Sequence, residues 1–348
     1  MRGDIVLRIQ PGDRAGANEA SARTDARLDR LVRLLEDHPM LVMSGTKLAE
    51  ELGTNRSEVW RLVQQLRELG VEISGHPSTG YRLEKVPDLL LPEILNPLLE
   101  ATIFADNIHH FFRVGSTNTL AMRAASQGEP EGAVFVAEEQ TAGRGRGGHR
   151  WESNPSEGIY CSAVLRPHLT PADVLLISLA TGLAVWEAVH EVTGIEADLR
   201  WPNDVLCGNR KVCGILIEMH AEATRVQHLV AGMGLNVNQH EFPPELRPVA
   251  TSLRLESGRD WSRVELAAAL LKSLDREYRA FVADLDVARR EVLRRFELHS
   301  SYVRGRAVEV DEDGGYQGIT AGMDARGFLQ VRTEAGMKTV LSGGVRPK

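Results

Sequence analysis

The chain has 348 residues, of which 43% are hydrophobic, and it carries a formal net charge of −7. A chain of this length is expected to form two or three domains, each with a packed core. The net charge gives no global sign of a nucleic-acid-binding protein. We find no apolar run that approaches the roughly 20 residues needed to span a bilayer, so no membrane partner is expected.

Residues 1–25 mix basic and acidic side chains and lack the long apolar stretch of a secretory signal. We interpret them as a flexible tail. The three cysteines, Cys161, Cys207 and Cys213, lie in apolar, strand-like segments and do not have the spacing of metal ligands. Reduced, buried thiols of this kind are typical of a cytoplasmic protein.

Three segments after the tail, residues 28–35, 46–52 and 56–69, have apolar residues at helical spacing. Asn55 is a good N-cap for the third, and Glu58 stands where a capping box needs it. Two short strands, residues 71–73 and 81–83, then flank a turn that contains two glycines and a proline. Three helices closed by a hairpin predict a winged helix-turn-helix domain over residues 26–86.

The third of these helices is the candidate DNA-recognition helix, which would lie in the major groove. Residues 26–86 carry nine basic and nine acidic residues, so the domain has little spare charge with which to bind phosphates. A domain that only packs or dimerises is therefore the alternative. The predicted DNA-binding residues are Ser57, Arg61 and Gln64 as base readers, with Arg56 and Arg67 near phosphates.

Residues 87–298 are expected to form one α+β domain with a mixed sheet. Prolines at positions 87, 92 and 97 indicate a connector, and from about Phe111 strands and helices alternate. Gly208 and Asn209 predict a tight turn between two of the strands. The expected strands are residues 134–137, 159–165, 199–201, 205–207, 211–219 and 228–233, and residues 172–192 are expected to form a long buried helix.

The most informative segment is the loop from Gln140 to Trp151, which contains Gly143-Arg144-Gly145-Arg146. Glycines let backbone N–H groups approach an anion closely, and arginines add forked, charge-assisted donors. Such a loop cannot contribute to a core. The pattern predicts a site for a phosphate or another anion.

Two later segments, Arg200 to Asp204 and Lys211 to Glu218, add further charged groups. Activation of a carboxylate with ATP brings two anions together, so its transition state needs cations where charge develops. The predicted catalytic residues are therefore Arg144, Arg146 and Lys211. Asp204 is a candidate Mg²⁺ ligand, because magnesium prefers oxygen donors.

In their order and spacing, and preceded by Ser116-Thr117-Asn118, these segments resemble the active site of biotin–protein ligases. The N-terminal domain, with Ser44-Gly45 and Gly80-Tyr81, is similar to the regulatory domain of bifunctional biotin ligases that also repress the biotin operon. The resemblance implies MgATP and biotin as reactants and biotinyl-5′-AMP as the intermediate. It also implies a carrier domain of acetyl-CoA carboxylase or a related carboxylase, operator DNA and a homodimer as partners.

The resemblance implies a role for each matching residue. The biotin-binding set would be Ser116, Thr117, Asn118, Gln140, Arg144, Gly145, Arg146 and Lys211. The ATP- and adenylate-binding set would be Trp151, Asn203, Asp204 and Asn236. Gly147 and His149 stand where relatives carry basic residues, and Arg200 replaces a commoner lysine. The loop is therefore expected to be less charged and more flexible, which affects how slowly it releases the adenylate.

Residues 299–348 contain short strand-like pieces at a spacing of about ten residues, separated by glycine turns, which predicts an SH3-like β-barrel. Two other functions are considered. One is a lipoate or octanoate ligase of the related fold, against which the glycine-arginine loop and Trp151 argue. The other is a biotin-sensing DNA-binding regulator without transfer activity, against which the presence of Lys211 and Arg146 argues.

Overall fold

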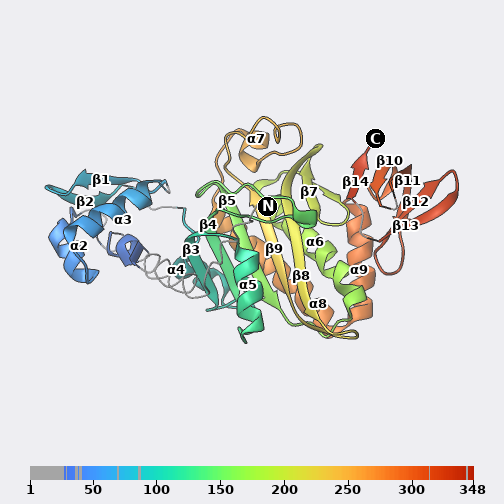
Figure 1. The fold of residues 1–348 in the computed structure, drawn as a ribbon, viewed down its shortest axis with the longest axis horizontal. Helices are drawn as coiled ribbons and strands as arrows, with labels where there is room; N and C mark the ends of the chain where they lie inside the picture. Colours follow the sequence, from blue (N-terminus) through green and yellow to red (C-terminus); the bar gives the residue numbers. More distant parts are fainter. Residues whose placement is uncertain are drawn as a thin grey trace, which may run out of the picture. The chain divides into compact units, whose positions relative to one another are not determined.

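The computed structural model describes residues 27–348 except 29, 36, 37, 39, 40, 69, 85–87, 313, 342 and 343. The predicted tail, residues 1–25, lies outside the described residues. The chain divides into two compact units (Figure 1), of which one contains residues up to Pro87 together with Phe111–Arg113 and the other contains the remainder. Each unit is described by itself.

The smaller unit has the predicted winged helix-turn-helix fold. Residues 27–28 and 30–35 are helical, and Leu28, Leu31, Val32 and Leu35 on their apolar face are buried. Two further helices and a β-hairpin follow. Asn55 Oδ1 accepts a hydrogen bond from Glu58 N at 2.9 Å, as the capping pattern predicts. Met43 extends the wing by pairing with Tyr81. The elements are α2 (Gly45–Glu51), α3 (Arg56–Glu68), β1 (Ile73–His76) and β2 (Gly80–Leu83).

The larger unit is built on a seven-stranded sheet with the order β3-β4-β5-β9-β8-β7-β6. Its strands are β3 (Ile108–Val114), β4 (Val134–Gln140), β5 (Gly158–Leu165), β6 (Asp198–Arg200), β7 (Asp204–Cys207), β8 (Arg210–Ala221) and β9 (Val226–Asn236). From β4 to β6 all neighbours are antiparallel. The predicted tight turn joins β7 to β8, with Cys207 opposite Arg210.

The first two strands make the sheet mixed, as predicted. Val134 N donates to Asn107 O, and Thr141 N donates to Val114 O, both at 2.9 Å. This constant offset between the two strands is the pattern of a parallel pair. Parallel neighbours need a crossover, and α5 (Thr117–Ser126) supplies it.

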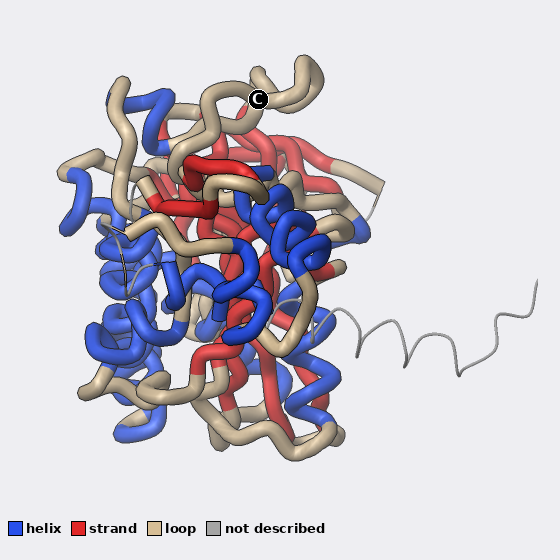
Figure 2. Tube along the Cα trace, turned by 90° about the vertical axis from the view of Figure 1, so that its left-hand side faces the viewer, coloured by secondary structure: helices blue, strands red, loops and turns tan. Residues whose placement is uncertain are grey.

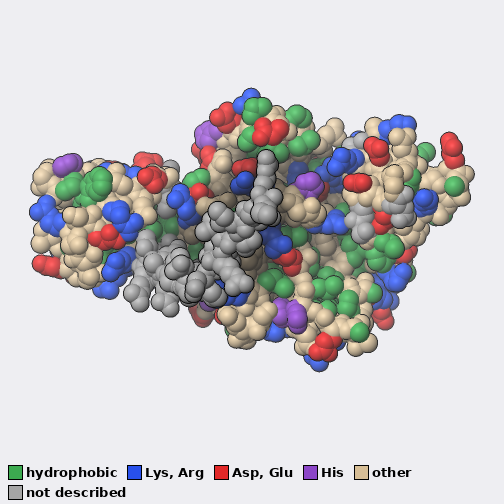
Figure 3. Space-filling model, in the orientation of Figure 1, with side chains coloured by type: hydrophobic (Ala, Val, Ile, Leu, Met, Phe, Trp, Pro, Cys, Tyr) green, Lys and Arg blue, Asp and Glu red, His purple; other side chains and the backbone are tan. Residues whose placement is uncertain are grey.

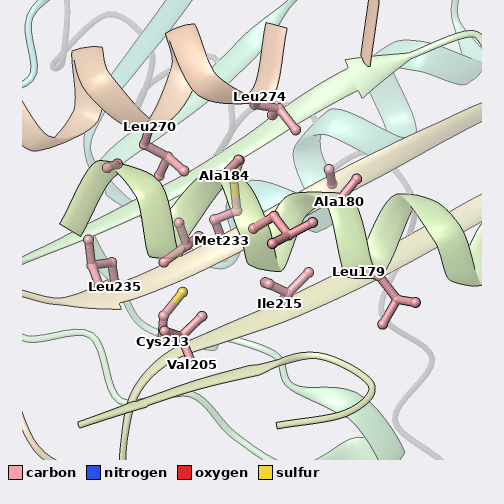
Figure 4. Close-up of a cluster of buried hydrophobic side chains, with 14 of the residues drawn as sticks. Leu179, Ala180, Ala184, Val205, Cys213, Ile215, Met233, Leu235, Leu270 and Leu274 are labelled. Carbon is pink, nitrogen blue, oxygen red and sulfur yellow. The ribbon is translucent and has the colours of Figure 1, made fainter. Parts of the chain in front are cut away.

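One face of the sheet is covered by three long helices, α6 (Val174–Thr193), α8 (Arg263–Ala283) and α9 (Leu285–Leu298) (Figure 1). In the side view of Figure 2 the long helices form a layer to the left of the strands. Figure 4 shows α6, with Ala180 and Ala184, lying between Leu270 and Leu274 of α8 and the strands that carry Ile215 and Met233. This continuous apolar layer is the main core.

Helix α6 corrects one expectation from the sequence. With the turn that precedes it, η2 (Pro171–Asp173), it forms a 23-residue helical segment of mean hydropathy 1.6, long and apolar enough for a membrane span. However, 67% of its most apolar window is buried inside the fold. It packs on the sheet as a core helix of a folded domain does.

The segment expected to be a connector contains a helix that the sequence analysis did not predict. Helix α4 (Pro92–Leu99) begins with Pro92 in its first turn, where the missing N–H is not needed. Leu95 and Leu99 on its inner face are fully buried. Burial of this apolar face outweighs the poor helix propensity of Pro97.

The C-terminal residues form a five-stranded antiparallel sheet with the order β13-β12-β11-β10-β14. The predicted strands are present, and β14 at the C-terminus was not predicted. This sheet meets the larger one where Trp201 Nε1 donates to Gly327 O at 2.9 Å. The strands are β10 (Arg304–Asp311), β11 (Tyr316–Met323), β12 (Leu329–Thr333), β13 (Gly336–Val340) and β14 (Gly344–Pro347).

Candidate active site

The candidate site lies on the face of the seven-stranded sheet opposite the long helices. Side chains alternate between the faces of a strand, so the core residues Cys161, Ile215 and Met233 define one face. Residues one position away, such as Ser162 and Gly214, therefore lie on the other face. Helix α5 and the loop from Gln140 to Trp151 cover this second face.

The N-terminus of α5 is joined to the end of β4 by hydrogen bonds. Ser116 is the N-cap, and its side chain accepts from Thr119 N. Gln140 Oε1 accepts from Thr117 N at 2.9 Å and lies 3.1 Å from Thr117 Oγ1. Gln140 Nε2 donates to Ser153 Oγ at 3.0 Å. The amide of Gln140 is therefore held at both ends.

A chain of hydrogen bonds continues from Thr117 across the sheet. Thr117 Oγ1 lies 2.8 Å from Ser162 Oγ, which donates to Asn118 Oδ1 at 3.0 Å. Asn118 Nδ2 in turn donates to Glu218 Oε2 at 2.7 Å. The carboxylate of Glu218 also pairs with Arg144, whose Nη2 is 3.1 Å from Oε1. Four of the predicted biotin-binding residues are thus joined in one network.

Glycines on the central strands make room for this network. A Cβ at position 232 would lie 2.2 Å from Asn118 Oδ1, so only glycine fits beneath that amide. Gly214 and Gly234 are cross-strand partners, and a Cβ at either would lie within 2.7 Å of the Trp151 indole. Trp151 therefore rests directly on the backbone of β8 and β9.

The glycine-arginine loop is a short hairpin with a helical tip, η1 (Arg146–Gly148). Trp151 N donates to Gly143 O at 3.0 Å, and Gly145 N donates to His149 O at 2.7 Å. Gly147 has a φ of +63°, a conformation that a side chain makes costly. The loop thus has its own backbone ladder, which places Arg144 and Arg146 at defined positions.

A β-bulge aims Lys211 at the site. Asp204 pairs with Gly214 and Val205 pairs with Cys213, but Leu206 pairs with Lys211, so β8 has one extra residue. A regular ladder would place Lys211 on the same face as Cys213, in the core. With the bulge, Lys211 lies on the face of Asp204, while Val212 is buried in the core.

Cations and Asp204 form a second group of site residues. Lys211 Nζ lies 2.7 Å from Asp204 Oδ1, and Arg200 Nη2 lies 2.6 Å from Asp204 Oδ2. Arg146 Nη1 donates to Asn203 Oδ1 at 3.1 Å. Burial lowers the pKa of Arg146, and the nearby Asp204 carboxylate opposes that shift. The group concentrates three cations around one acid.

Asn203 and Asn236 both hold the backbone of the site. Asn203 Nδ2 donates to Ile215 O at 2.7 Å, and its own carbonyl accepts from Ile215 N. Asn236, which is 3% exposed, donates to Thr251 O at 3.0 Å. Thr251 N donates to Lys211 O, so Asn236 supports the segment beside the lysine.

The arrangement does not fit a protein-held magnesium ion at Asp204. Both carboxylate oxygens already face cations, Lys211 and Arg200. Among the residues that the structure describes, no group of three or more His, Cys, Asp or Glu side chains could hold a metal. The sequence-based expectation of magnesium at Asp204 finds no support in this geometry.

The predicted DNA-binding residues all belong to α3, but its arginines have partners within their own unit. Arg56 Nη2 donates to Pro77 O at 2.6 Å, and Arg67 donates to Ile73 O at 2.8 and 3.0 Å. Arg61 forms a bidentate pair with Glu58 at 2.6 and 2.8 Å. Ser57 is exposed and Gln64 is half-buried. On the face drawn in Figure 3, basic and acidic side chains of this unit are intermixed.

Sequence reasoning missed three residues of the site: Ser162, Arg200 as a partner of Asp204, and Glu218. A signal for Glu218 was present. It stands in an apolar strand and shares the alternation of Gly214 and Leu216, so it had to lie on their face. No sequence signal indicated that Ser162 would lie between Thr117 and Asn118.

Comparisons with known proteins agree with this architecture. Residues 111–236 match the biotin/lipoate A/B protein ligase family, and residues 27–82 match an HTH domain. The bifunctional ligase/repressor BirA of Bacillus spizizenii is 32% identical over 318 residues, which cover 90% of this chain and 97% of that protein. The chain belongs to the family of bifunctional biotin ligase/repressors.

Other members and their structures extend the comparison. A biotin–[acetyl-CoA-carboxylase] ligase of Mycobacterium tuberculosis is 35% identical to this ligase over 239 residues, 67% of this chain and 85% of that protein. The biotin protein ligase of Aquifex aeolicus, solved in complex with biotin and ATP, superimposes with a TM-score of 0.61 at 32% identity. That match covers 70% of this chain and 100% of the Aquifex chain.

Proposed function

We propose that this ligase joins biotin to AMP, using ATP, and then transfers the biotinyl group to a lysine of a carboxylase carrier domain. Family membership supports the activity as a whole. The observation that carries the proposal is the placement of Lys211 by a β-bulge beside Asp204, in the group that also holds Arg146 through Asn203. This group suits a reaction between two anions.

The two groups of site residues have different proposed roles. Ser116, Thr117, Asn118 and Gln140 form a neutral hydrogen-bonding set suited to the ureido head of biotin. Gly145 provides close backbone approach in the loop. Arg144, Arg146 and Lys211 would face the biotin carboxylate and the α-phosphate. Trp151 would stack against the adenylate, with Asn203, Asp204 and Asn236 on the nucleotide side.

The chemistry consists of two displacements. First, a carboxylate oxygen of biotin attacks the α-phosphorus of ATP, and the bond to pyrophosphate breaks. Then the neutral amine of the carrier lysine attacks the acyl carbon, AMP leaves with the electron pair of the C–O bond, and the attacking nitrogen loses one proton to water. In the first step Lys211 and Arg146 offset the charge that builds on the phosphoryl oxygens. Asp204 keeps Lys211 in position until the anions arrive.

Magnesium would enter with the phosphates of ATP rather than on a prepared protein site. When bound, it would neutralise phosphate charge. No residue of this chain is assigned to it.

The test is incubation of the full chain with biotin, ATP, magnesium and a carrier domain of acetyl-CoA carboxylase, followed by intact-mass measurement. One biotinyl addition that requires ATP is expected. A carrier whose target lysine is changed to arginine is the matched control. If lipoate replaces biotin in a parallel incubation and only lipoate becomes attached to the carrier, the related lipoate ligase would be favoured. If no biotinyl group is attached to any of several carriers, the ligase assignment would be rejected.

DNA binding is the second proposed function, supported by the winged helix-turn-helix fold and by the HTH match. We propose that a homodimer binds an inverted-repeat operator, with Ser57, Arg61 and Gln64 toward the bases and Arg56 and Arg67 near phosphates. Because Arg61 is paired with Glu58, it must exchange this partner to reach DNA. A mobility-shift assay with DNA upstream of the organism's biotin genes tests this, with and without biotin plus ATP, at stated salt. Equal DNA binding with and without biotin plus ATP would contradict regulation of DNA binding by biotin.

The proposed location is the cytoplasm, where the carrier domain and DNA are accessible. The three cysteines are free thiols and buried, which suits a reducing compartment.

A further inference from the structure

Glu218 is a charged side chain that follows the apolar run Ile215–Ile217 on β8, and the proposed chemistry gives it no role. It lies on β8, on the face that carries the site, with its side chain 26% exposed. Its cross-strand partner, on the same face, is the fully buried Val230. A carboxylate in such surroundings is costly unless it is paired and hydrogen-bonded.

Both oxygens of Glu218 have partners that belong to the site. Oε2 accepts from Asn118 Nδ2 at 2.7 Å. Arg144 approaches with Nη2 3.1 Å from Oε1 and with Nη1 3.3 Å from Oε2. One residue comes from the start of α5 and the other from the glycine-arginine loop, so Glu218 is where these two segments meet on the sheet.

The carboxylate determines which way the amide of Asn118 points. A carboxylate can only accept hydrogen bonds, so Asn118 must present its NH₂ group to Glu218. The amide oxygen is then directed to Ser162, which donates to it at 3.0 Å. The absence of a side chain at Gly232 lets the amide lie flat on the sheet. An amide held at both ends offers a ligand a fixed pattern of donor and acceptor.

The ion pair with Arg144 has a different role, because it is more exposed. Arg144 is 51% exposed, so the pair is open to solvent and contributes little to stability by itself. It does, however, tie the loop to β8 at the point where Asn118 is held. Loop position and amide orientation therefore depend on the same carboxylate.

We propose that Glu218 is a positioning residue for the first half-reaction, which orients Asn118 for the head group of biotin and holds Arg144 over the site. This inference rests on the proposed function. Glu218 is not expected to contact the reacting atoms. A change of its carboxylate is expected to weaken biotin binding and to loosen the glycine-arginine loop together.

The first experiment compares Glu218→Gln with wild type in biotin-dependent pyrophosphate release. The variant keeps the shape but loses the charge, and its amide can present NH₂ instead of oxygen to Asn118. The KM for biotin should rise about tenfold, the effect of weakening one hydrogen bond to a charged group. The KM for ATP should change much less. Glu222→Gln, an exposed acid just beyond the end of β8, is the matched control and should behave as wild type.

The second experiment is a double-mutant cycle with Asn118→Ala. If Glu218 acts through Asn118, Glu218→Gln should raise the KM for biotin far less in the Asn118→Ala background than in wild type. Hydrogen exchange of residues 143–150 with biotin bound should be faster in Glu218→Gln than in wild type, because Arg144 is released. Melting temperature reports whether each variant is folded.

The outcomes separate the inference from the proposed function. A wild-type chain that does not adenylate biotin would reject the function itself. If the wild type is active, additive effects of Glu218→Gln and Asn118→Ala would overturn the positioning role. Equal rises of the KM for biotin and the KM for ATP in Glu218→Gln would also overturn it. An unchanged KM for biotin in a folded Glu218→Gln variant would overturn it as well.

Discussion

Both units contain arginines that the sequence predicts to bind anionic ligands, yet the two units hold these side chains in different ways. In the larger unit Arg144 and Arg146 are presented by a hairpin on the open face of the sheet, and their partners, Glu218 and Asn203, are themselves site residues. In the winged helix Arg56 and Arg67 donate to backbone carbonyls of the wing, and Arg61 is paired within its own helix.

The difference shows that residue type and exposure alone do not identify a binding arginine. The ligase arginines are held where a ligand can replace or join their partners. The arginines at the two ends of α3 support the hairpin, so their loss would affect the fold as well as DNA binding. Only Arg61 is held by a side chain that it can leave at small cost.

The largest effect on stability is expected from a buried pair in the larger unit. Arg263 Nη1 lies 2.8 Å from Glu138 Oε2, and both side chains are at most 1% exposed. Arg263→Met removes the buried guanidinium that pairs with the Glu138 charge and should cost about 3–5 kcal/mol. Urea unfolding measures this loss. The double variant Arg263→Met, Glu138→Leu should recover much of the lost free energy of unfolding. If the double variant is destabilised as much as Arg263→Met alone, the pairing would be contradicted.

Lys211→Ala should affect catalysis strongly and folding little. The side chain is 31% exposed and follows a turn, so its removal leaves no buried cavity. Loss of a cation where two anions meet should slow adenylation about 100- to 1000-fold. Pyrophosphate release is measured beside the melting temperature. Unchanged adenylation in a folded variant would refute the role of Lys211.

The pH dependence of stability tests the same buried cluster. Burial alone would raise the pKa of Glu138, but Arg263, His110 and the N–H of Leu90 outweigh it and lower that pKa to about 2. The pair therefore stabilises the fold fully above the ordinary pKa of 4.5, and this contribution is lost as pH falls toward 2. Urea midpoints of wild type and Glu138→Gln should converge over that range. A difference between the two urea midpoints that stays constant with pH would argue against the lowered pKa of Glu138.

The smallest effect is expected in the winged helix. Glu58→Gln frees Arg61 and should reduce stability by less than about 1 kcal/mol, because the pair is partly exposed. Affinity for operator DNA should rise modestly, since Arg61 no longer has a competing partner. The mobility-shift assay measures it, and Glu51→Gln on α2 is the control. A fall in affinity would indicate that Glu58 positions Arg61 for DNA.

Much of the site could be predicted from local sequence. The motif around Asn118, the end of β4 and the glycine-arginine loop indicated residues that the structure does bring together. The face on which Lys211 lies could not be predicted in this way, because the sequence from Lys211 to Cys213 fits both a regular strand and a bulged one. Helix α4 was missed because Pro92 and Pro97 suggested a connector, whereas burial of Leu95 and Leu99 decided the local structure. Ion-pair partners depend on tertiary distances, which spacing does not supply.

The bulge in β8 also limits how this region can change in evolution. If the register of β7 and β8 slipped by one residue so that the bulge was lost, Lys211 would pair with Cys207 and its side chain would turn from Asp204 into the apolar layer. Deletion of Val212 is different, because it removes the extra residue and leaves Lys211 opposite Leu206, on the face of Asp204. Functional variants are therefore expected to keep Lys211 and Gly214 three positions apart with the bulge, or two positions apart without it.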